Sequence, residues 1–197
     1  MEAKSTNSEN IERAIKEILE SIGENPEREG LKETPNRIAR MFQEIFRGYD
    51  KAKKPKITTF ENEYHNEEMI FDSGSYYSMC EHHMMPFFGK YCIAYIPDRD
   101  GRILGISKIG RVVDYCAARL QLQERLAIDI VSMLEDALDD MYRPKGFAIM
   151  MKGKHLCKSM RGARKEGEMT VIHCTGVFKS DKELQKQFVE MAKGMIS

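Results

Sequence analysis

The sequence carries no excess of charge of either sign. Its 197 residues include 31 Lys plus Arg and 31 Asp plus Glu, which leaves a formal net charge of zero. A chain with this balance has no general attraction for nucleic acid or for an anionic membrane surface. We therefore predict that neither is a partner, and that any anionic ligand is bound by a local group of basic residues.

Long apolar runs and a disulfide pattern are also missing. The first residues contain no apolar core of the kind found in signal peptides, and no stretch of the chain is long enough to span a bilayer. Five cysteines are an odd number in a chain too large to need disulfides, so reduced thiols or metal ligands are expected. Internal repeats and a glycine-rich phosphate loop are absent too. These features predict a cytoplasmic globular protein.

Residues 1–55 are predicted to form a helical N-terminal region and linker. Apolar residues recur at helical spacing over residues 9–22, and Gly23 follows as a stop signal. A second helix is expected to begin at Thr34-Pro35, with Thr34 as its N-cap. The basic segment that follows this helix reads as a solvated connector.

The remainder of the chain alternates between strand-like and helical patterns. Short β-rich runs occupy residues 57–97, with an interruption at Gly74. A long helical stretch, capped by Ser107, is expected to continue through Met141. Strands at both ends of this stretch would place helices and sheet in separate layers.

Two further strands are expected near the C-terminus, over residues 147–151 and 170–178, followed by a helix capped by Asp181. Strands grouped before and after a long helical pair favour a largely antiparallel sheet with helices on one face. The sequence therefore predicts an α+β fold for residues 56–197.

Two short clusters, Cys80-Glu-His-His83 and His155-Leu-Cys157, carry thiols and imidazoles. Zinc binds both donor types, and a catalytic zinc site keeps three protein ligands and one open position. We predict that Cys80, His83 and Cys157 bind Zn²⁺. The remaining two histidines, His82 and His155, would lie beside the metal as proton-transfer groups. Residues two apart on an extended segment face the same side, so His155 and Cys157 can reach one site.

A fourth ligand would make the zinc site structural rather than catalytic. His82 is the candidate, but adjacent residues of an extended chain point to opposite sides, which separates it from His83. A zinc-bound water of increased acidity suits attack on an electrophilic carbon and favours a hydrolase. A nucleoside deaminase remains an alternative, although its H-x-E and P-C-x-x-C motifs are absent. A zinc-stabilised interaction module without catalysis is the other alternative.

Seven basic residues and no acidic residue lie between Lys145 and Lys165. Some of them can be a charged strand edge. Arg161 and Arg164 are the better candidates for binding phosphate oxygens through paired hydrogen bonds. The residues alone thus predict a zinc hydrolase that acts on a polyanionic small molecule.

Several segments resemble the GTP cyclohydrolase I family, in the family's order and from about residue 10 to the C-terminus. The segments that carry the resemblance are Glu33-Thr-Pro-Asn-Arg-Ile38, Ser78-Met-Cys-Glu-His-His83, Pro86-Phe-Phe-Gly-Lys90, Ala94-Tyr-Ile-Pro97, Leu104-Gly-Ile-Ser-Lys108, Arg119-Leu-Gln-Leu-Gln-Glu-Arg-Leu126, His155-Leu-Cys157, Met160-Arg-Gly-Ala-Arg-Lys165 and Gly176-Val-Phe178.

The resemblance implies hydrolysis of GTP at C8 of the guanine, release of that carbon as formate, and rearrangement to 7,8-dihydroneopterin triphosphate. This is the first step of tetrahydrofolate and pterin biosynthesis. It implies the same zinc ligands and the same two proton-transfer histidines. By the resemblance, Glu124 would hold the guanine, and the triphosphate contacts would be Arg37, Ser107, Lys108, Arg111 and Arg161. All of these except Arg161 have no function that their residue type alone would predict.

Members of the family have the tunnelling fold, an antiparallel sheet with helices on one side, and assemble as toroidal homodecamers with active sites at subunit interfaces. One chain is then not expected to contain a complete site. The stretch Val171-Ile-His-Cys174 departs from the Ser- and Thr-rich pattern that is usual there. A strand lets only one of His173 and Cys174 point inward. The family gives Glu81 no role.

Overall fold

The computed structural model describes residues 8–138 and 143–197, which form two compact units divided between Lys53 and Lys54. The N-terminal unit contains α1 (Ser8–Ser21) and α2 (Thr34–Ile45), which pack against each other, and two short 3₁₀ helices, Arg47–Tyr49 and Lys51–Lys53. Both predicted helices are confirmed. The N-cap of α2 is Glu33 rather than Thr34, and Pro35 lies in the first turn, where its missing N–H is not needed.

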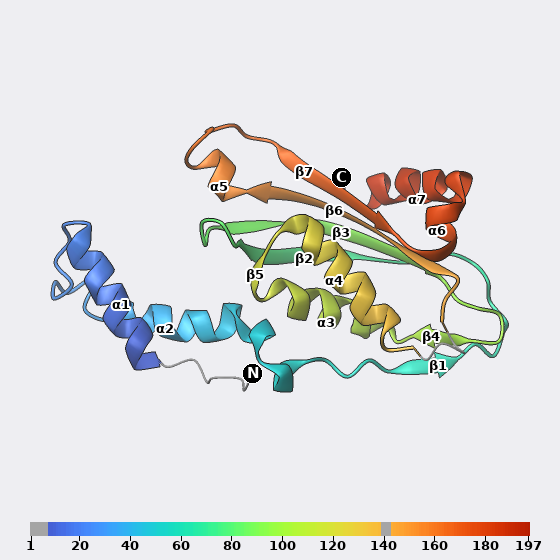
Figure 1. The fold of residues 1–197 in the computed structure, drawn as a ribbon, viewed down its shortest axis with the longest axis horizontal. Coiled ribbons are helices and arrows are strands. Elements are labelled where there is room, and N and C mark those ends of the chain that lie inside the picture. Colours follow the sequence, from blue (N-terminus) through green and yellow to red (C-terminus); the bar gives the residue numbers. More distant parts are fainter. Residues whose placement is uncertain (1–7, 139–142) are drawn as a thin grey trace. The chain divides into compact units, whose positions relative to one another are not determined.

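The second unit is built on a five-stranded sheet with the order β5-β2-β3-β6-β7 (Figure 1). Strands β2 and β3, β3 and β6, and β6 and β7 pair antiparallel, whereas β2 and β5 pair in parallel. A separate two-stranded sheet joins β1 to β4. The strands are β1 (Thr59–Glu61), β2 (Ile70–Cys80), β3 (Pro86–Ile96), β4 (Arg102–Leu104), β5 (Leu120–Gln121), β6 (Gly146–His155) and β7 (Glu168–Cys174).

The interruption predicted at Gly74 is wrong, because β2 runs through this residue without a break. Gly74 lies directly opposite Tyr91 of β3. A Cβ atom at position 74 would come within 3.0 Å of the Tyr91 ring. Glycine is therefore present to admit a tyrosine side chain, and it does not end the strand.

The helical stretch predicted from Ser107 to Met141, which was expected to be a helical pair, consists of two helices, α3 (Ile106–Ala117) and α4 (Gln123–Glu135). They are separated by β5, whose residues pair with the end of β2, so tertiary pairing overrides the helical pattern. The N-cap of α3 is Gly105 and not Ser107. The predicted end of the helix at Met141 lies outside the described residues.

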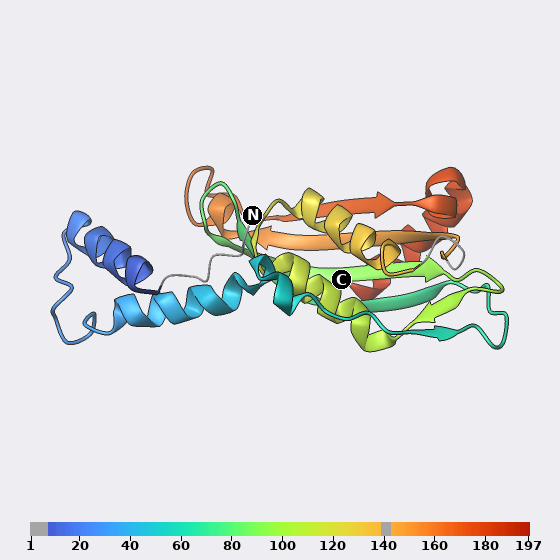
Figure 2. The same ribbon diagram turned by 60° about the horizontal axis from the view of Figure 1, so that its bottom comes forward.

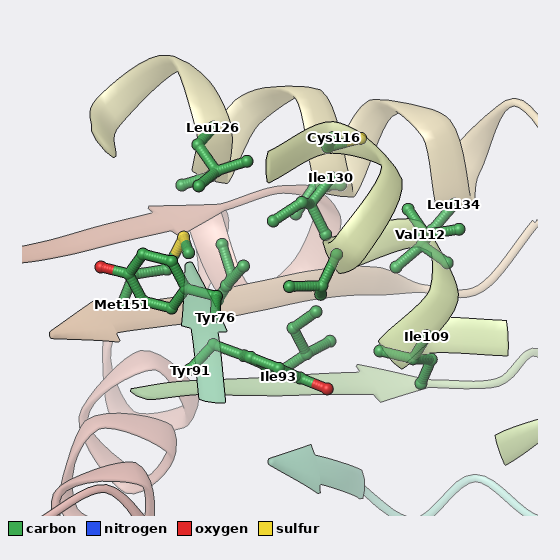
Figure 3. Packing of buried hydrophobic residues seen from close by; sticks show 14 of the residues in the cluster. Tyr76, Tyr91, Ile93, Ile109, Val112, Cys116, Leu126, Ile130, Leu134 and Met151 are labelled. Carbon is green, nitrogen blue, oxygen red and sulfur yellow. The ribbon is translucent and has the colours of Figure 1, made fainter. Parts of the chain in front are cut away.

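One face of the sheet packs against α3 and α4 and forms the larger core. Figure 3 shows Tyr76, Tyr91 and Ile93 of the sheet facing apolar residues of both helices, among them Val112 and Ile130. All five of these residues are nearly or fully buried. The regular spacing of apolar residues along α3 and α4 therefore reflects this contact.

The opposite face of the sheet is covered at one end by α6 (Gly176–Ser180) and α7 (Lys182–Met195). Phe178 and Phe188 are fully buried there. The predicted strand over residues 170–178 thus ends early, at Cys174. Asp181 caps α7 as predicted, because its carboxylate accepts hydrogen bonds from the Glu183 and Leu184 amides at 2.9 and 3.1 Å.

The predicted α+β class is confirmed. The second unit of the chain follows the tunnelling-fold arrangement, an antiparallel sheet with α3 and α4 on one side. In addition, β5 forms a parallel edge strand, and α7 covers part of the other side. None of the helices in the described part of the chain has the length and apolar character that crossing a bilayer requires.

Candidate metal centre and its surroundings

The three predicted zinc ligands meet at one end of the sheet. Cys80 is the last residue of β2, His83 lies in the turn after it, and Cys157 lies in the short helix α5 (Leu156–Ser159) that follows β6. Their ligand atoms all lie within 4.8 Å of one another. Because β2 and β6 both run antiparallel to β3, which lies between them, they end at the same edge of the sheet. Figure 2 shows α5 near the β2–β3 turn at this edge.

The chemistry of this group fits zinc. Burial raises the pKa of Cys157, and a hydrogen bond and charge interaction with Cys80 raise it further. Two thiolates so close would repel each other, and a divalent cation between them removes this conflict. Two thiolates and one imidazole are zinc donors, and the group includes no fourth His, Cys or carboxylate among the described residues. The donor set therefore leaves room for a further ligand.

The separation of His82 from His83 has a different cause from the one predicted. Residues 81–83 form a turn and not an extended segment, so strand alternation does not apply. The turn is closed by hydrogen bonds from the Cys80 amide to the Met85 carbonyl and from the Met84 amide to the Cys80 carbonyl, both 2.8 Å. The two imidazoles lie edge to face, with centroids 6.3 Å apart. His82 is exposed and is not part of the metal-binding group.

The same correction applies to the second cluster. His155 ends β6, but Cys157 lies within α5, so the two side chains are not neighbours on one face of a strand. The change from strand to helix turns Cys157 toward Cys80. His155 remains on the sheet, directly opposite Phe87 of β3.

His155 is held by a residue that sequence reasoning missed. The buried Gln123 carboxamide donates from Nε2 to the carbonyls of Met151 and Met169, both at 3.0 Å. Its Oε1 lies 2.8 Å from Nε2 of His155 and must accept from that nitrogen. In the neutral ring, Nδ1 is then the unprotonated nitrogen.

Burial lowers the pKa of His155, and the nearby Glu124 carboxylate partly opposes this effect. Burial thus favours the neutral ring, which can accept a proton. A signal for Gln123 does exist in the sequence. It shares a helical face with Leu126, Ala127 and Ile130, so it is a polar residue at a position where the apolar pattern predicts burial.

Two of the predicted substrate contacts lie at the same end of the sheet as the metal ligands. Glu124 is exposed at the start of α4, close enough for its charge to act on His155. Arg161 follows α5 and donates from Nη1 to Nε2 of His83 at 2.8 Å. A carboxylate and a guanidinium thus flank the candidate centre.

The predicted contacts on α3 lie away from the metal ligands. Ser107 and Lys108 are at the start of α3, and only the end of that helix, at Ala117, reaches the Ser78 hydroxyl (2.7 Å) next to the metal ligands. At 1.5 Å per residue, Lys108 is about 14 Å from Ala117 along the helix. Arg111 lies one turn further along α3 and is exposed. Arg37 is exposed on α2 of the N-terminal unit.

His173 and Cys174 are also remote from the metal ligands. His173 pairs with Ile149, six positions before His155 on β6, which corresponds to about 20 Å along a strand. The Cys174 thiol accepts a hydrogen bond from the Gln185 amide at 3.4 Å and packs under α7. The departure from the family pattern at this position belongs to the core.

The chain is similar to known proteins along most of its length. The family model for GTP cyclohydrolase I matches residues 11–193. A "GTP cyclohydrolase 1" of Streptococcus agalactiae is 43% identical over 186 residues, which cover 94% of this chain and 97% of that protein. Another, from Caldanaerobacter subterraneus, is 44% identical over 184 residues, covering 93% of this chain and 95% of that protein. The chain therefore belongs to the GTP cyclohydrolase I family of enzymes.

Proposed function

We propose that the protein hydrolyses GTP at C8 of the guanine, releases that carbon as formate and rearranges the product to 7,8-dihydroneopterin triphosphate. This would be the first step of tetrahydrofolate and pterin biosynthesis, carried out in the cytoplasm. The observation that carries the proposal is the convergence of Cys80, His83 and Cys157 beside His155 in a chain of this family. Catalysis is assigned to residues 56–197.

Cys80, His83 and Cys157 would hold the Zn²⁺ ion. When bound there, zinc would increase the acidity of a water molecule for attack on an electrophilic carbon. The two thiols and the imidazole supply the donors that zinc prefers. His82, which is outside this group, stays available to the substrate.

His82 and His155 are proposed to transfer protons. The ring nitrogen that leaves during opening of the imidazole must be protonated, because an amide anion is a poor leaving group. At His155 the proton would move at Nδ1, since Nε2 is occupied by its hydrogen bond to Gln123. Stacking on Phe87 also fixes the plane of the ring, so Nδ1 would exchange the proton in one fixed direction.

Glu124 and Arg161 are proposed to bind the two ends of the nucleotide. A carboxylate at position 124 can accept hydrogen bonds from the ring N–H and the exocyclic amino group of guanine. The Arg161 guanidinium suits phosphate oxygens. In the family-based assignment, Arg37, Ser107, Lys108 and Arg111 would complete the triphosphate contacts.

The separation of Ser107 and Lys108 from the metal ligands supports a site shared between copies of the chain. Both residues are at the start of α3, about 14 Å along the helix from Ala117, whose carbonyl contacts Ser78 next to the metal ligands. A neighbouring copy would supply them. This arrangement agrees with the proposed homodecamer with active sites at subunit interfaces.

The proposal is tested by incubating the zinc-loaded protein with GTP and analysing the products by mass spectrometry. Formate and a pterin that becomes fluorescent on oxidation are expected in equal amounts. Ammonia in place of formate would indicate a deaminase instead. Formate without a pterin would show that the reaction stops at a ring-opened intermediate, and no product at all would overturn the proposal.

A further inference from the structure

Glu81 lies between two of the proposed metal ligands and forms an ion pair with Arg125 of α4. Sequence patterns leave Glu81 without a role. In the structure, the pair joins the turn that follows Cys80 to the first turn of α4. The adjacent residue on α4 is Glu124, the proposed guanine contact.

The Arg125 guanidinium is braced on its other side. Its Nε donates to Oε1 of Gln121 at 3.0 Å, and Nη2 donates to the Leu120 carbonyl at 3.3 Å as well as to Glu81. Gln121 is fully buried, and its Nε2 donates to the Cys116 carbonyl at 3.1 Å and to Asp129 at 2.9 Å. A satisfied buried amide therefore fixes the direction in which Arg125 points.

The backbone makes a second connection between the same segments. Cys80 pairs with Gln121 in the parallel β2–β5 ladder, and the Glu81 amide donates to the Gln121 carbonyl at 3.1 Å. Within the turn, Met84 has a left-handed backbone with φ of 51°, a conformation that is unfavourable for a residue with a side chain. The turn needs outside contacts to keep this shape, and the Glu81 side chain provides one.

We propose that Glu81 and Arg125 are a positioning pair, which holds Cys80 and His83 in the arrangement that binds the metal and fixes them relative to Glu124. The inference rests on the proposed function for the presence of zinc. Neither residue touches the metal or the nucleotide in this scheme. Both act through the residues beside them, in the way that groups around a metal site orient its ligands.

A second ion pair of the chain serves as a matched control. Glu67 and Lys145 pair with side-chain exposures of 42% and 36%, close to the 30% and 44% of Glu81 and Arg125. Lys145 lies at the opposite end of the sheet, where its amide donates to the Ile96 carbonyl. A variant of this control pair therefore shows the effect of losing a half-exposed ion pair anywhere in the fold. An effect specific to the turn at residues 81–83 can then be recognised.

The test measures zinc affinity of the full chain by competition with a chromophoric chelator, and records the visible spectrum of the Co²⁺-substituted protein. Glu81→Gln and Arg125→Gln should each weaken zinc binding by about tenfold and alter the cobalt ligand-field bands. The double variant should bind no more weakly than the worse single variant, because the two residues act as one unit. Glu67→Gln should leave affinity and spectrum unchanged.

Unchanged zinc affinity and an unchanged cobalt spectrum in Glu81→Gln would overturn the inference while leaving the proposed function intact. Equal weakening in Glu67→Gln would overturn it as well, by assigning the effect to general stability. If the parent protein itself binds neither metal through the two thiols, the zinc-dependent function fails first, and the inference with it. Thermal unfolding of each variant shows whether Arg125→Gln still folds; Glu81→Gln decides the matter if it does not.

Discussion

The imidazole of His155 lies parallel to the ring of Phe87, with ring centroids 4.6 Å apart and 5° between the planes. The two residues are direct partners in the β3–β6 ladder, so the sheet register itself produces the stack. Gln123 fixes the rotation of the same ring through its edge. Stacking on the ring face and a hydrogen bond at the ring edge therefore hold this proposed proton carrier in place before substrate binds.

Replacing Gln123 with Ala should impair both turnover and stability. His155 would lose the partner that selects its tautomer, and we expect kcat to fall by about 10- to 100-fold, part of what positioned proton transfer contributes. Loss of the buried hydrogen bonds should lower the free energy of unfolding by about 1–3 kcal/mol. Steady-state formate release and urea unfolding measure the two effects. Gln185→Ala, which removes hydrogen bonds with Cys174 and Lys182 and none with His155, is the control and should keep kcat.

Variants of the proposed zinc ligands should lose zinc, whereas variants of the proposed proton carriers should keep zinc and lose turnover. Cys157→Ala should retain little zinc, because two protein donors bind it far more weakly than three. His82→Ala should keep one zinc per chain and lose about 100-fold or more in turnover. Elemental analysis together with formate release distinguishes the two. Loss of zinc from His82→Ala would instead identify His82 as a ligand and favour a structural site.

A site shared between copies predicts that two inactive variants restore activity when mixed. Cys157→Ala removes a metal ligand, and Lys108→Ala removes a proposed phosphate contact at the far end of α3. In randomly mixed oligomers refolded from equal amounts, about a quarter of the sites would combine an intact metal group from one copy with an intact Lys108 from another. Assays of the mixture against each variant alone provide the test. No recovery in verified mixed oligomers would mean that both residues act within one chain.

Asp72 should make stability depend on pH. Burial raises the pKa of its carboxyl, and the hydrogen bond that it accepts from the Tyr91 hydroxyl at 3.0 Å offsets part of this. A raised pKa means that the fold prefers the protonated carboxyl, so this stability is fully present below the unfolded pKa and is lost as the pH rises through the folded pKa.

Asp72→Asn should therefore unfold at a higher temperature than the parent at pH 7, and this advantage should shrink as the pH falls toward 4. Thermal scans over this range, with the exposed Asp136→Asn as control, measure the effect. A parent protein that is more stable than Asp72→Asn at pH 7 would contradict the argument.

Adding a methyl group at a glycine should raise the free energy of unfolding where the space is open and lower it where other atoms are close. A Cβ at Gly194 of α7 would meet no atom within 4 Å, whereas one at Gly153 would lie 2.2 Å from the Tyr76 hydroxyl and 3.0 Å from Oε1 of Gln123. Gly194→Ala should raise the free energy of unfolding by about 0.5–1 kcal/mol. Gly153→Ala should lower it by about 1–3 kcal/mol. Chemical denaturation of both variants gives the comparison.

The metal group could be predicted from the sequence because its chemistry depends on residue type. Thiols and imidazoles in two short clusters define a donor set whichever way the backbone runs. The local arguments about backbone direction were wrong at both clusters, since residues 81–83 turn and Cys157 is helical. The convergence of Cys80, His83 and Cys157 thus did not depend on the local geometry that was used to support it.

The fold class was predictable from periodicity, and the errors lie where tertiary contacts decide. The break between α3 and α4 exists because Leu120 and Gln121 pair with β2, and the continuity of β2 exists because Tyr91 fills the space above Gly74. Neither partner is close in sequence. The Gln123–His155 and Glu81–Arg125 contacts were missed for the same reason.

The placement of Cys80 at the end of β2 and of Cys157 in α5, which follows β6, also bears on the order of folding. These two thiols are far apart in the sequence, and they meet only after β6 has paired with β3 and α5 has formed. Closing so long a loop is slow compared with forming local turns and helices. All three proposed ligands can then bind the metal only when the sheet is nearly complete. The metal would therefore stabilise the chain late in folding and would not nucleate folding.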